Sequence, residues 1–375
     1  MTRPCPRLRV LKFPDAKRLP KPVRVAILVV AVYAFILSIV LLGDGFKLLG
    51  ERFVHTLLSL TFTPLSGMFV GLLVTSIIQS SSCTTSLVVG LVSSGTLDVT
   101  HAIPVIMGAN IGTTITNTLV SLAHVTRRQE FARAFPAAIV HDVFNVLTVI
   151  LLLPLEAAFH PLANMSGFLA RTFSGVGGFV VSSPLQFITE PVARFAAGVF
   201  AHCAWLLIIL ALVLLFIALT YIVEMMRSLV SRRVELVIDR YLFGNALKAF
   251  LLGLLFTSIV QSSSVTLSMV VPLAGAGLLT LRQIFPYTLG ANLGTTVTAI
   301  LAALVTGSAG GIQIAFAHLC FNIGGMVVWY PLRVVPVKLA EWWGGFCARH
   351  RAMAVVYVIV AFFAIPLAVV ILTRR

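Results

Sequence analysis

Three apolar runs limit what this chain can fold into. The clearest are Val25–Leu42, Cys203–Val223 and Ala352–Leu372, each at or near the roughly 20 residues that a helix needs to cross a bilayer. Only 10% of the residues are charged, whereas a soluble domain normally carries about a quarter. One such run could be a buried core helix, but several in the same chain predict an all-α polytopic membrane protein.

The basic residues predict how the chain is oriented. The formal net charge of +15 does not indicate nucleic-acid binding, because Lys and Arg gather at the edges of the apolar runs. One cluster precedes Val25 and a second follows Val223, whereas 156–201 contains only Arg171 and Arg194. Lys and Arg accumulate in cytoplasmic loops. We therefore place the N-terminus and 224–246 in the cytoplasm and 156–201 outside, in a plasma (inner) membrane.

The chain also contains an internal duplication. Thr75–Ser82 (TSIIQSSS) matches Thr257–Ser264 (TSIVQSSS), and Gly108–Thr114 (GANIGTT) matches Gly290–Thr296 (GANLGTT), both at an offset of 182 residues. Across 75–118 and 257–300, 22 of 44 residues are identical, and a His-x-x-x-Asn pair recurs at 141–145 and 318–322. Opposite flanking spans predict that the two copies enter the membrane from opposite faces, as inverted-topology repeats do in secondary transporters.

This duplication divides the chain into five parts. We expect a basic cytoplasmic tail (1–24), transmembrane repeat 1 (25–155), an extracytoplasmic loop (156–202) and transmembrane repeat 2 (203–331), followed by an amphipathic connection with a final transmembrane helix (332–375).

The QSSS motif lies in the middle of a long apolar segment. Residues 64–95 as one helix would extend about 48 Å, beyond a hydrocarbon core of about 30 Å, so a re-entrant hairpin or broken helix with QSSS at its tip fits better. The second copy repeats this over 247–277. Hydroxyls and the free N–H groups of a new helix can bind an oxyanion without a fixed charge. The predicted anion-binding residues are Gln79, Ser80, Ser81, Ser82, Gln261, Ser262, Ser263 and Ser264.

Oxygen-bearing side chains nearby suit a hard cation such as sodium. Asp142 is the one acidic residue well inside an apolar run, and its counterpart in the second copy is Leu319. A carboxylate at that depth is by default a functional hypothesis, although a structural pairing with a neighbour such as His141 stays open. The predicted sodium-binding residues are Asn110, Thr113, Thr114, Asp142, Asn145, Asn292, Thr295 and Thr296.

Other interpretations are weaker. Ser and Thr in membrane helices often only bond to carbonyls or join helices, but two long polar motifs at a fixed spacing argue against that alone. An intramembrane serine hydrolase would need a nucleophile setting such as G-x-S-x-G, which the serine triplets lack. A channel and a proton-coupled oxyanion carrier remain open.

These motifs resemble the type II sodium–phosphate cotransporters and their bacterial relatives, over roughly 65–155 and 245–370. The similarity is carried by Gln79–Ser82, Gly108–Thr118, Ala134–Asp142, Gln261–Val265, Thr288–Thr296 and Phe321–Pro331.

The resemblance implies a symporter with phosphate at the two QSSS tips and sodium, the coupling ion, on nearby side chains, without any other cofactor. It implies an electrogenic cycle with an extra sodium at Asp142, and it is compatible with a homodimer of separately functional protomers. Within this family, the sequence resembles a bacterial-type member without an appended C-terminal regulatory domain. His124 and Arg127 depart from the family pattern, which commonly has Gln and an acidic residue there.

Overall fold

The computed structural model describes residues 19–58, 63–93, 95, 97–173, 184–200, 203–229, 243–306 and 308–373, which form helices without a strand. Within these ranges, four segments are long and apolar enough to cross a membrane: Val99–Leu122, Arg128–Phe159, Ala309–Trp329 and Ala352–Leu372. The predicted all-α polytopic fold is therefore confirmed. Most of the basic residues on which the predicted orientation depends, at 3–18 and 232–240, lie outside the described residues.

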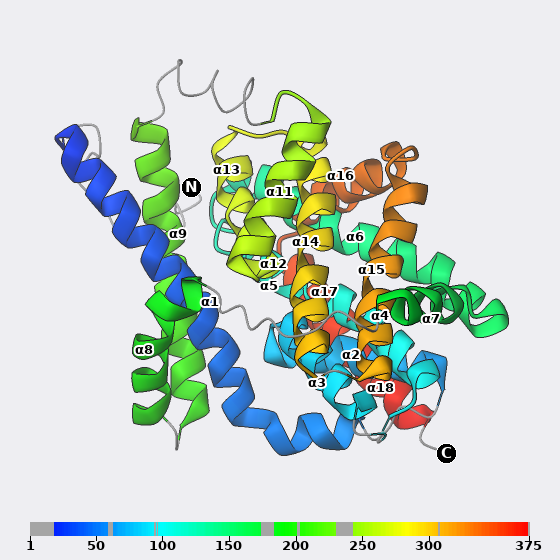
Figure 1. Ribbon diagram of the computed structural model, residues 1–375. Coiled ribbons are helices and arrows are strands. Elements are labelled where there is room, and N and C mark those ends of the chain that lie inside the picture. Colours follow the sequence, from blue (N-terminus) through cyan, green and yellow to red (C-terminus); the bar gives the residue numbers. More distant parts are fainter. Residues whose placement is uncertain are drawn as a thin grey trace.

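The order of helices follows the duplication (Figure 1). The first half consists of α1 (Lys21–Leu58), α2 (Pro64–Ile78), α3 (Ser81–Ser93), α4 (Val99–Gly112), α5 (Ile115–Leu122) and α6 (Arg128–Phe159). The second half consists of α9 (Ala204–Leu229), α11 (Ala246–Val260), α12 (Ser263–Ser268), α13 (Val270–Ala276), α14 (Leu281–Thr306) and α15 (Ala309–Trp329). Helix α2 packs on α4 and α11 packs on α14, so the same pairing occurs in both halves.

Glycines of the two GAN motifs allow these helix pairs to approach closely. A Cβ atom on Gly108 would overlap the carbonyl oxygen of Met68, and one on Gly290 would overlap that of Phe250. Because only glycine lacks this atom, the backbones of α2 and α4, and of α11 and α14, come into direct contact. In each pair, the second glycine of the motif lies nearer the QSSS break: Gly112 faces Thr75 and Ser76, and Gly294 faces Thr257.

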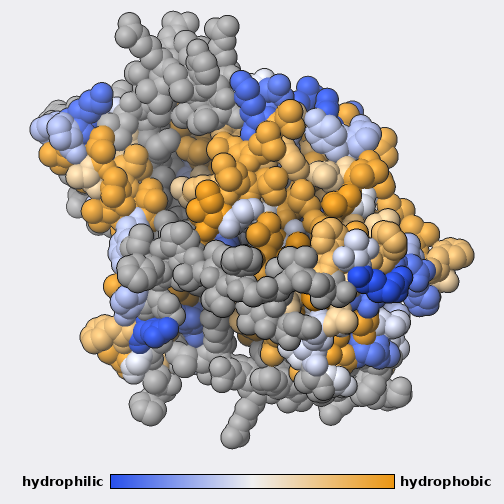
Figure 2. Space-filling view, in the orientation of Figure 1, coloured by the Kyte–Doolittle hydropathy of each residue, from blue (hydrophilic) through white to orange (hydrophobic). Residues whose placement is uncertain are grey.

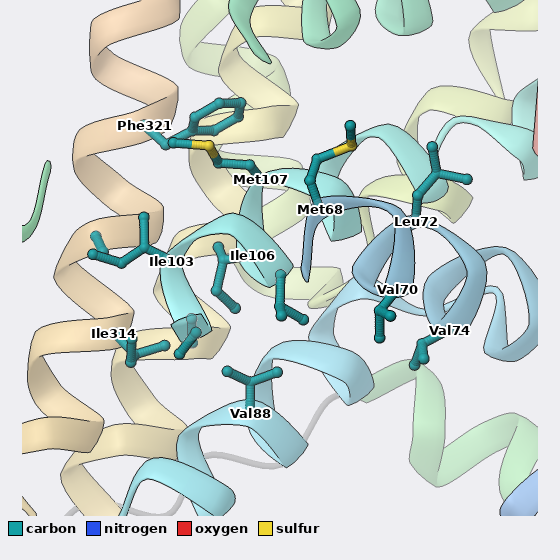
Figure 3. Packing of buried hydrophobic residues seen from close by; sticks show 14 of the residues in the cluster. Met68, Val70, Leu72, Val74, Val88, Ile103, Ile106, Met107, Ile314 and Phe321 are labelled. Atoms are coloured by element: carbon teal, nitrogen blue, oxygen red, sulfur yellow. The ribbon is translucent and has the colours of Figure 1, made fainter. Parts of the chain in front are cut away.

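The two halves share one core. Figure 3 shows Ile103, Ile106 and Met107 of α4 packed together with Ile314 and Phe321 of α15. Helix α15 belongs to the second half, whereas α4 belongs to the first. The repeats are therefore interlocked, and neither half buries its apolar residues by itself.

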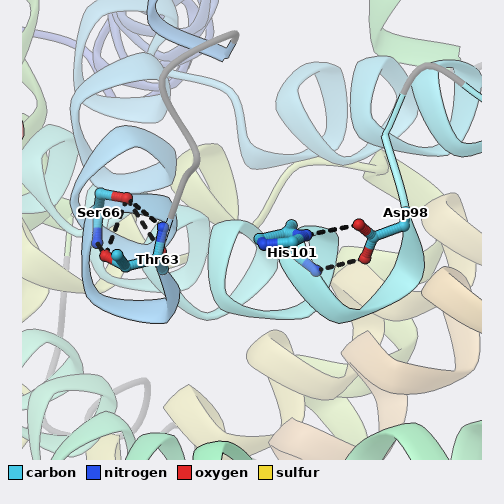
Figure 4. Close-up of polar contacts among 4 residues, drawn as sticks. All are labelled: Thr63, Ser66, Asp98 and His101. Carbon is cyan, nitrogen blue, oxygen red and sulfur yellow. Dashed lines mark hydrogen bonds and ion pairs between the residues drawn. The ribbon is translucent and has the colours of Figure 1, made fainter. Parts of the chain in front are cut away.

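Polar side chains cap the helices that begin the first repeat's site (Figure 4). At α2, the Ser66 amide donates to Thr63 Oγ1 at 3.1 Å, and the Thr63 amide donates to Ser66 Oγ at 2.9 Å. At α4, the His101 amide donates to Asp98 Oδ1 at 3.0 Å. Such caps satisfy amides that have no partner within a helix, and they define where both helices begin.

The segment 156–202, which we expected to form a loop, contains the helices α7 (Pro161–Phe173) and α8 (Pro184–Val199), and α6 extends into it as far as Phe159. The buried carboxylate of Glu156 accepts hydrogen bonds from the amides of Leu162 and Ala163, at 2.7 and 3.1 Å, and so caps α7. The side of the membrane on which this segment lies remains a prediction.

The C-terminal part consists of α16 (Val334–Arg349), α17 (Ala352–Ile359), the π-helical turn η3 (Val360–Ala364) and α18 (Ile365–Leu372). Helix α16 packs along α6, with Gly344 against Pro136. Helices α17 to α18 form one continuous apolar segment, which is the last of the four candidate spans. In Figure 1, α18 ends beside α2, at the opposite end of the molecule from α16.

The surface carries apolar side chains where a bilayer would cover them. Leu247, Leu251, Leu255 and Ile259 of α11 are exposed and recur every four residues, along one face of the helix. Figure 2 shows apolar residues across this part of the molecule, with hydrophilic residues above them. Exposed apolar surface of this kind marks a contact with lipid or protein in a membrane protein.

Candidate functional site

Both QSSS motifs interrupt a helix in the same way. Gln79 and Gln261 have φ/ψ angles of 55°/28° and 57°/26°, which is the left-handed conformation. The amide of each glutamine donates to a threonine carbonyl four residues earlier, Thr75 or Thr257, at 2.7 Å. A non-glycine residue in this conformation costs roughly 1–2 kcal/mol. Backbone strain repeated in both copies indicates a turn that the surrounding structure constrains.

The serines after each break begin the next helix. Ser80 Oγ accepts from the amide of Cys83 at 3.2 Å, and Ser262 Oγ accepts from the amide of Val265 at 3.3 Å. These hydroxyls cap helices whose first amides have no partner within the helix. A helix start of this kind binds anions, and the hydroxyl hydrogens of the serines remain available as further donors.

The two tips are in contact with each other. Ser82 Oγ donates to the backbone carbonyl of Gln261 at 3.4 Å, which joins residues 179 positions apart. The structure thus brings the two groups of predicted anion-binding residues together.

Gln79 provides a further indication of a ligand. Its side chain is 5% exposed, and neither amide atom has a hydrogen-bond partner among the described residues. A buried polar group without a partner costs about 1–3 kcal/mol, and an external group that paired with this amide would recover that cost.

Three of the predicted sodium-binding residues are connected. The side-chain amide of Asn292 (α14) donates to Asn145 Oδ1 (α6) at 2.9 Å, and that of Asn145 donates to the backbone carbonyl of Asn110 (α4) at 3.0 Å. Asn110, Asn145 and Asn292 are all buried. They come from both repeats, so the site is shared between the halves.

The predicted acidic residue has a threonine partner. Asp142 is 1% exposed, and its Oδ1 lies 3.0 Å from Thr114 Oγ1, which also lies 2.8 Å from the carbonyl of Ile111. The structure therefore pairs Asp142 with Thr114, whereas the histidine beside it in sequence, His141, faces asparagines.

Among the described residues, the remaining predicted sodium-binding side chains form hydrogen bonds only to carbonyls of the preceding helical turn. The hydroxyls of Thr113, Thr295 and Thr296 donate to the carbonyls of Ala109, Ala291 and Leu293 at 2.8, 3.1 and 2.7 Å. A hydroxyl that donates to a carbonyl keeps its lone pairs for another partner. These residues are thus available as oxygen ligands, but no hydrogen bond joins them to the asparagines.

Two histidines that we did not include among the site residues connect the repeats. His141 Nε2 lies 2.7 Å from Asn292 Oδ1, and His318 Nε2 lies 3.1 Å from Asn110 Oδ1. Each histidine thus contacts the GAN asparagine of the opposite repeat. The recurring His-x-x-x-Asn pair in the sequence was the signal that could have identified them.

The residues that depart from the family pattern form a separate cluster. Arg127 Nη1 lies 3.3 Å from Glu130 Oε1, and His124 Nδ1 lies 3.2 Å from Glu130 Oε2. Glu130 precedes Asp142 by twelve residues of the same helix (142 − 130), or about 18 Å. Arg127 therefore neutralises Glu130 rather than Asp142.

The structure is that of a multi-pass membrane protein in which both halves contain a helix broken at a QSSS motif. A family model described as Na+/Pi-cotransporter matches residues 34–177 and 214–339. Sodium-dependent phosphate transport protein 2A of Rattus norvegicus is 34% identical over 92% of this chain and 67% of its own length, and protein 2B of Homo sapiens is 34% identical over 92% and 64%. The chain belongs to the Na+/Pi-cotransporter family.

Membership of this family makes the chain a membrane transporter and excludes the serine-hydrolase interpretation. The chain spans about two thirds of the length of these relatives. No solved structure matches it.

Proposed function

We propose that this protein is a secondary active transporter that couples sodium entry to uptake of inorganic phosphate. Phosphate is held between the two QSSS tips, and the repeats alternate access to it from opposite sides of a plasma (inner) membrane, with the N-terminus in the cytoplasm. Sodium is the coupling ion, and no other cofactor takes part. The observation that carries the proposal is the contact between the tips, beside the buried and unpartnered Gln79 amide.

The chemistry of the tips supports an oxyanion. Gln and Ser carry no formal charge, but they provide amide and hydroxyl donors from both sides of the Ser82–Gln261 contact. A doubly charged phosphate bound to neutral donors within a membrane needs counter-charge, because burial of an isolated charge is unfavourable. Bound cations satisfy that need, and this explains physically why phosphate and sodium would move together.

The asparagines, threonines and Asp142 support sodium as that cation. Their ligand atoms are oxygens, which hard cations prefer, and all of them are buried. Asp142 adds a negative charge in the first repeat only, since its counterpart is Leu319. We therefore propose an electrogenic cycle in which one additional sodium binds at Asp142.

Uptake of labelled phosphate into proteoliposomes tests the proposed function. We expect uptake to saturate with phosphate, to require an inward sodium gradient, and to be lost when potassium or choline replaces sodium. Equal uptake in all three salts would reject sodium coupling. Uptake driven by an imposed proton gradient would support a proton-coupled oxyanion carrier. Uptake that never raises the internal phosphate concentration above its equilibrium value would support a channel.

Serine variants of the tips test the location of the phosphate site. Ser80→Ala, Ser81→Ala, Ser262→Ala and Ser263→Ala each remove one hydroxyl donor, and a hydrogen bond to a charged ligand is worth about 1.5–3 kcal/mol, or roughly ten- to a hundredfold in affinity. Ser258→Ala is the matched control, because Ser258 Oγ donates within α11 to the carbonyl of Leu254 at 2.8 Å. Unchanged phosphate affinity in all four folded tip variants would place phosphate elsewhere.

A further inference from the structure

A line of hydrogen bonds leads from the second tip to the sodium candidates. Ser268, the last residue of α12, donates through Oγ to Asn117 Oδ1 at 3.0 Å. Asn117 Nδ2 lies 3.3 Å from His141 Nδ1, and His141 Nε2 lies 2.7 Å from Asn292 Oδ1. All four side chains are buried. Because α12 begins with the tip residue Ser263, this line starts on the helix that the tip initiates.

The donors and acceptors in this line have one consistent direction. The Asn117 oxygen faces the Ser268 hydroxyl, so its nitrogen faces His141 Nδ1, which must therefore accept. His141 is then neutral and carries its proton on Nε2, from which it donates to the Asn292 oxygen. The Asn292 amide continues to Asn145 Oδ1, and the Asn145 amide continues to the Asn110 carbonyl.

Among the described residues, the second repeat mirrors only part of this line: His318 and Asn322 both contact Asn110. At the offset of 182 residues, the counterpart of Asn117 is Ala299, and that of Ser268 is Ser86. His318, the counterpart of His141, contacts Asn110 through Nε2, but its buried Nδ1 has no hydrogen-bond partner among the described residues. The missing amide at position 299 accounts for this unpartnered nitrogen. The part of the line from Ser268 to His141 therefore has no equivalent among the described contacts around His318.

We propose that the line Ser268–Asn117–His141–Asn292–Asn145, which we call the relay, couples phosphate binding at the second tip to sodium binding at the asparagines. Its members act as positioning residues, and the proposal rests on the proposed function. Rotation of any one amide would place two donors or two acceptors against each other, so the relay has an intact arrangement and a broken one. Such a two-state element is what energetic coupling between sites requires.

The proposal predicts a reciprocal effect. If phosphate holds α12 where Ser268 reaches Asn117, the asparagine oxygens are held for sodium, and sodium in turn favours phosphate. Coupling of this kind typically changes affinity by about 5- to 150-fold, and by thermodynamic necessity the factor is the same in both directions. The quantity to measure is therefore the ratio of phosphate affinities with and without sodium.

Equilibrium binding of labelled phosphate to the purified full chain, with and without saturating sodium, provides this ratio. Ser268→Ala and Asn117→Ala each break the relay, so we expect the ratio to fall to about one while affinity without sodium stays at the wild-type value. Ser268→Thr keeps a hydroxyl and should restore the ratio. Ser86→Ala, the same change at the equivalent position of the first repeat, should leave it unchanged.

The outcomes separate the relay from the proposed function. A sodium effect on phosphate binding that persists in Ser268→Ala overturns the relay but leaves sodium coupling intact. Phosphate binding that is independent of sodium in the wild-type protein overturns both. If Asn117→Ala does not fold, Ser268→Ala tests the relay alone, since it removes a single oxygen. A ratio of phosphate affinities that is lost in Ser268→Ala but kept in Ser268→Thr would show that the hydrogen bond, and not packing, is responsible.

Discussion

The two repeats share a framework but differ in their buried polar residues. Each has a left-handed glutamine at the helix break, a glycine in close backbone contact, and a histidine that reaches the other repeat's asparagine. Yet His141 has partners on both ring nitrogens and is followed by Asp142, whereas His318 has a partner on one nitrogen and is followed by Leu319. Asp142 therefore belongs to one copy only of a framework whose backbone features occur in both.

Substitution of the shared glycines tests the framework and should have the largest effect. Gly108→Ala and Gly290→Ala would each place a methyl group on a backbone carbonyl of the facing helix. Overpacking costs about 1–3 kcal/mol and sometimes more, and here backbone rather than a flexible side chain obstructs the methyl group. We expect both variants to unfold at clearly lower temperature in detergent, by similar amounts.

Gly90→Ala is the matched control for these glycines, because nothing lies within 4 Å of a Cβ atom at that position. A Gly108→Ala protein as stable as Gly90→Ala would contradict the close approach of α2 and α4. Unequal losses at Gly108 and Gly290 would contradict the equivalence of the two helix pairs.

Much of the framework could be predicted from the sequence, because it depends on local patterns. The length of 64–95 and the position of Gln79 in its middle indicated a break, which lies between α2 and α3. Helices α7 and α8 were not predicted, since the sparse Lys and Arg of 156–201 indicated only a side of the membrane and not a secondary structure.

The contacts of the site could be predicted only in part. The residues that join it are far apart in sequence: His141 and Asn292 are separated by 151 positions, and Asn110 and His318 by 208. The repeated motifs identified which side chains were unusual, but only packing of α4, α6, α14 and α15 determines which of them meet.

Replacement of the acidic residue tests the difference between the repeats. We expect Asp142→Asn to abolish phosphate-evoked current while phosphate uptake persists at reduced affinity, because an amide at this depth cannot balance an extra sodium. Current across proteoliposome membranes and uptake of labelled phosphate would be measured on the same preparation.

Leu319→Asn places the same amide at the equivalent, half-buried position of the second repeat and should leave the current intact. A wild-type protein that moves phosphate without current at any voltage would show that Asp142 serves only as the partner of Thr114, and that no extra sodium binds.

Replacement of Asn117 by alanine gives the first repeat the residue that the second has at the equivalent position, Ala299. We expect an effect on stability that is smaller than that of the glycine variants. Asn117→Ala leaves Ser268 Oγ and His141 Nδ1 without their partner, and each unsatisfied buried group costs about 1–3 kcal/mol. We expect a lower free energy of unfolding. The adjacent Thr116→Val is the control, because the buried Thr116 hydroxyl has no partner among the described residues, so its loss should be neutral or stabilising. Equal destabilisation by both variants would count against the Asn117 hydrogen bonds.

The smallest effect on transport is expected from replacement of Arg127. This variant tests whether Asp142 acts without an influence from the Arg127 guanidinium. Arg127 pairs with Glu130 at 3.3 Å, and its side chain is 37% exposed, whereas that of Glu130 is 7% exposed. Glu130 keeps its contact with His124 when Arg127 is replaced. Because Glu130 lies about 18 Å along α6 from Asp142, Arg127→Gln should change neither the current per phosphate nor its sodium dependence. An increase in charge moved per phosphate in Arg127→Gln would mean that the guanidinium acts on the sodium at Asp142. The negative charge of Asp142, which the second repeat lacks, would then be offset in the wild-type protein by Arg127. An unchanged ratio, together with loss of current in Asp142→Asn, would assign the electrical difference between the repeats to Asp142 itself.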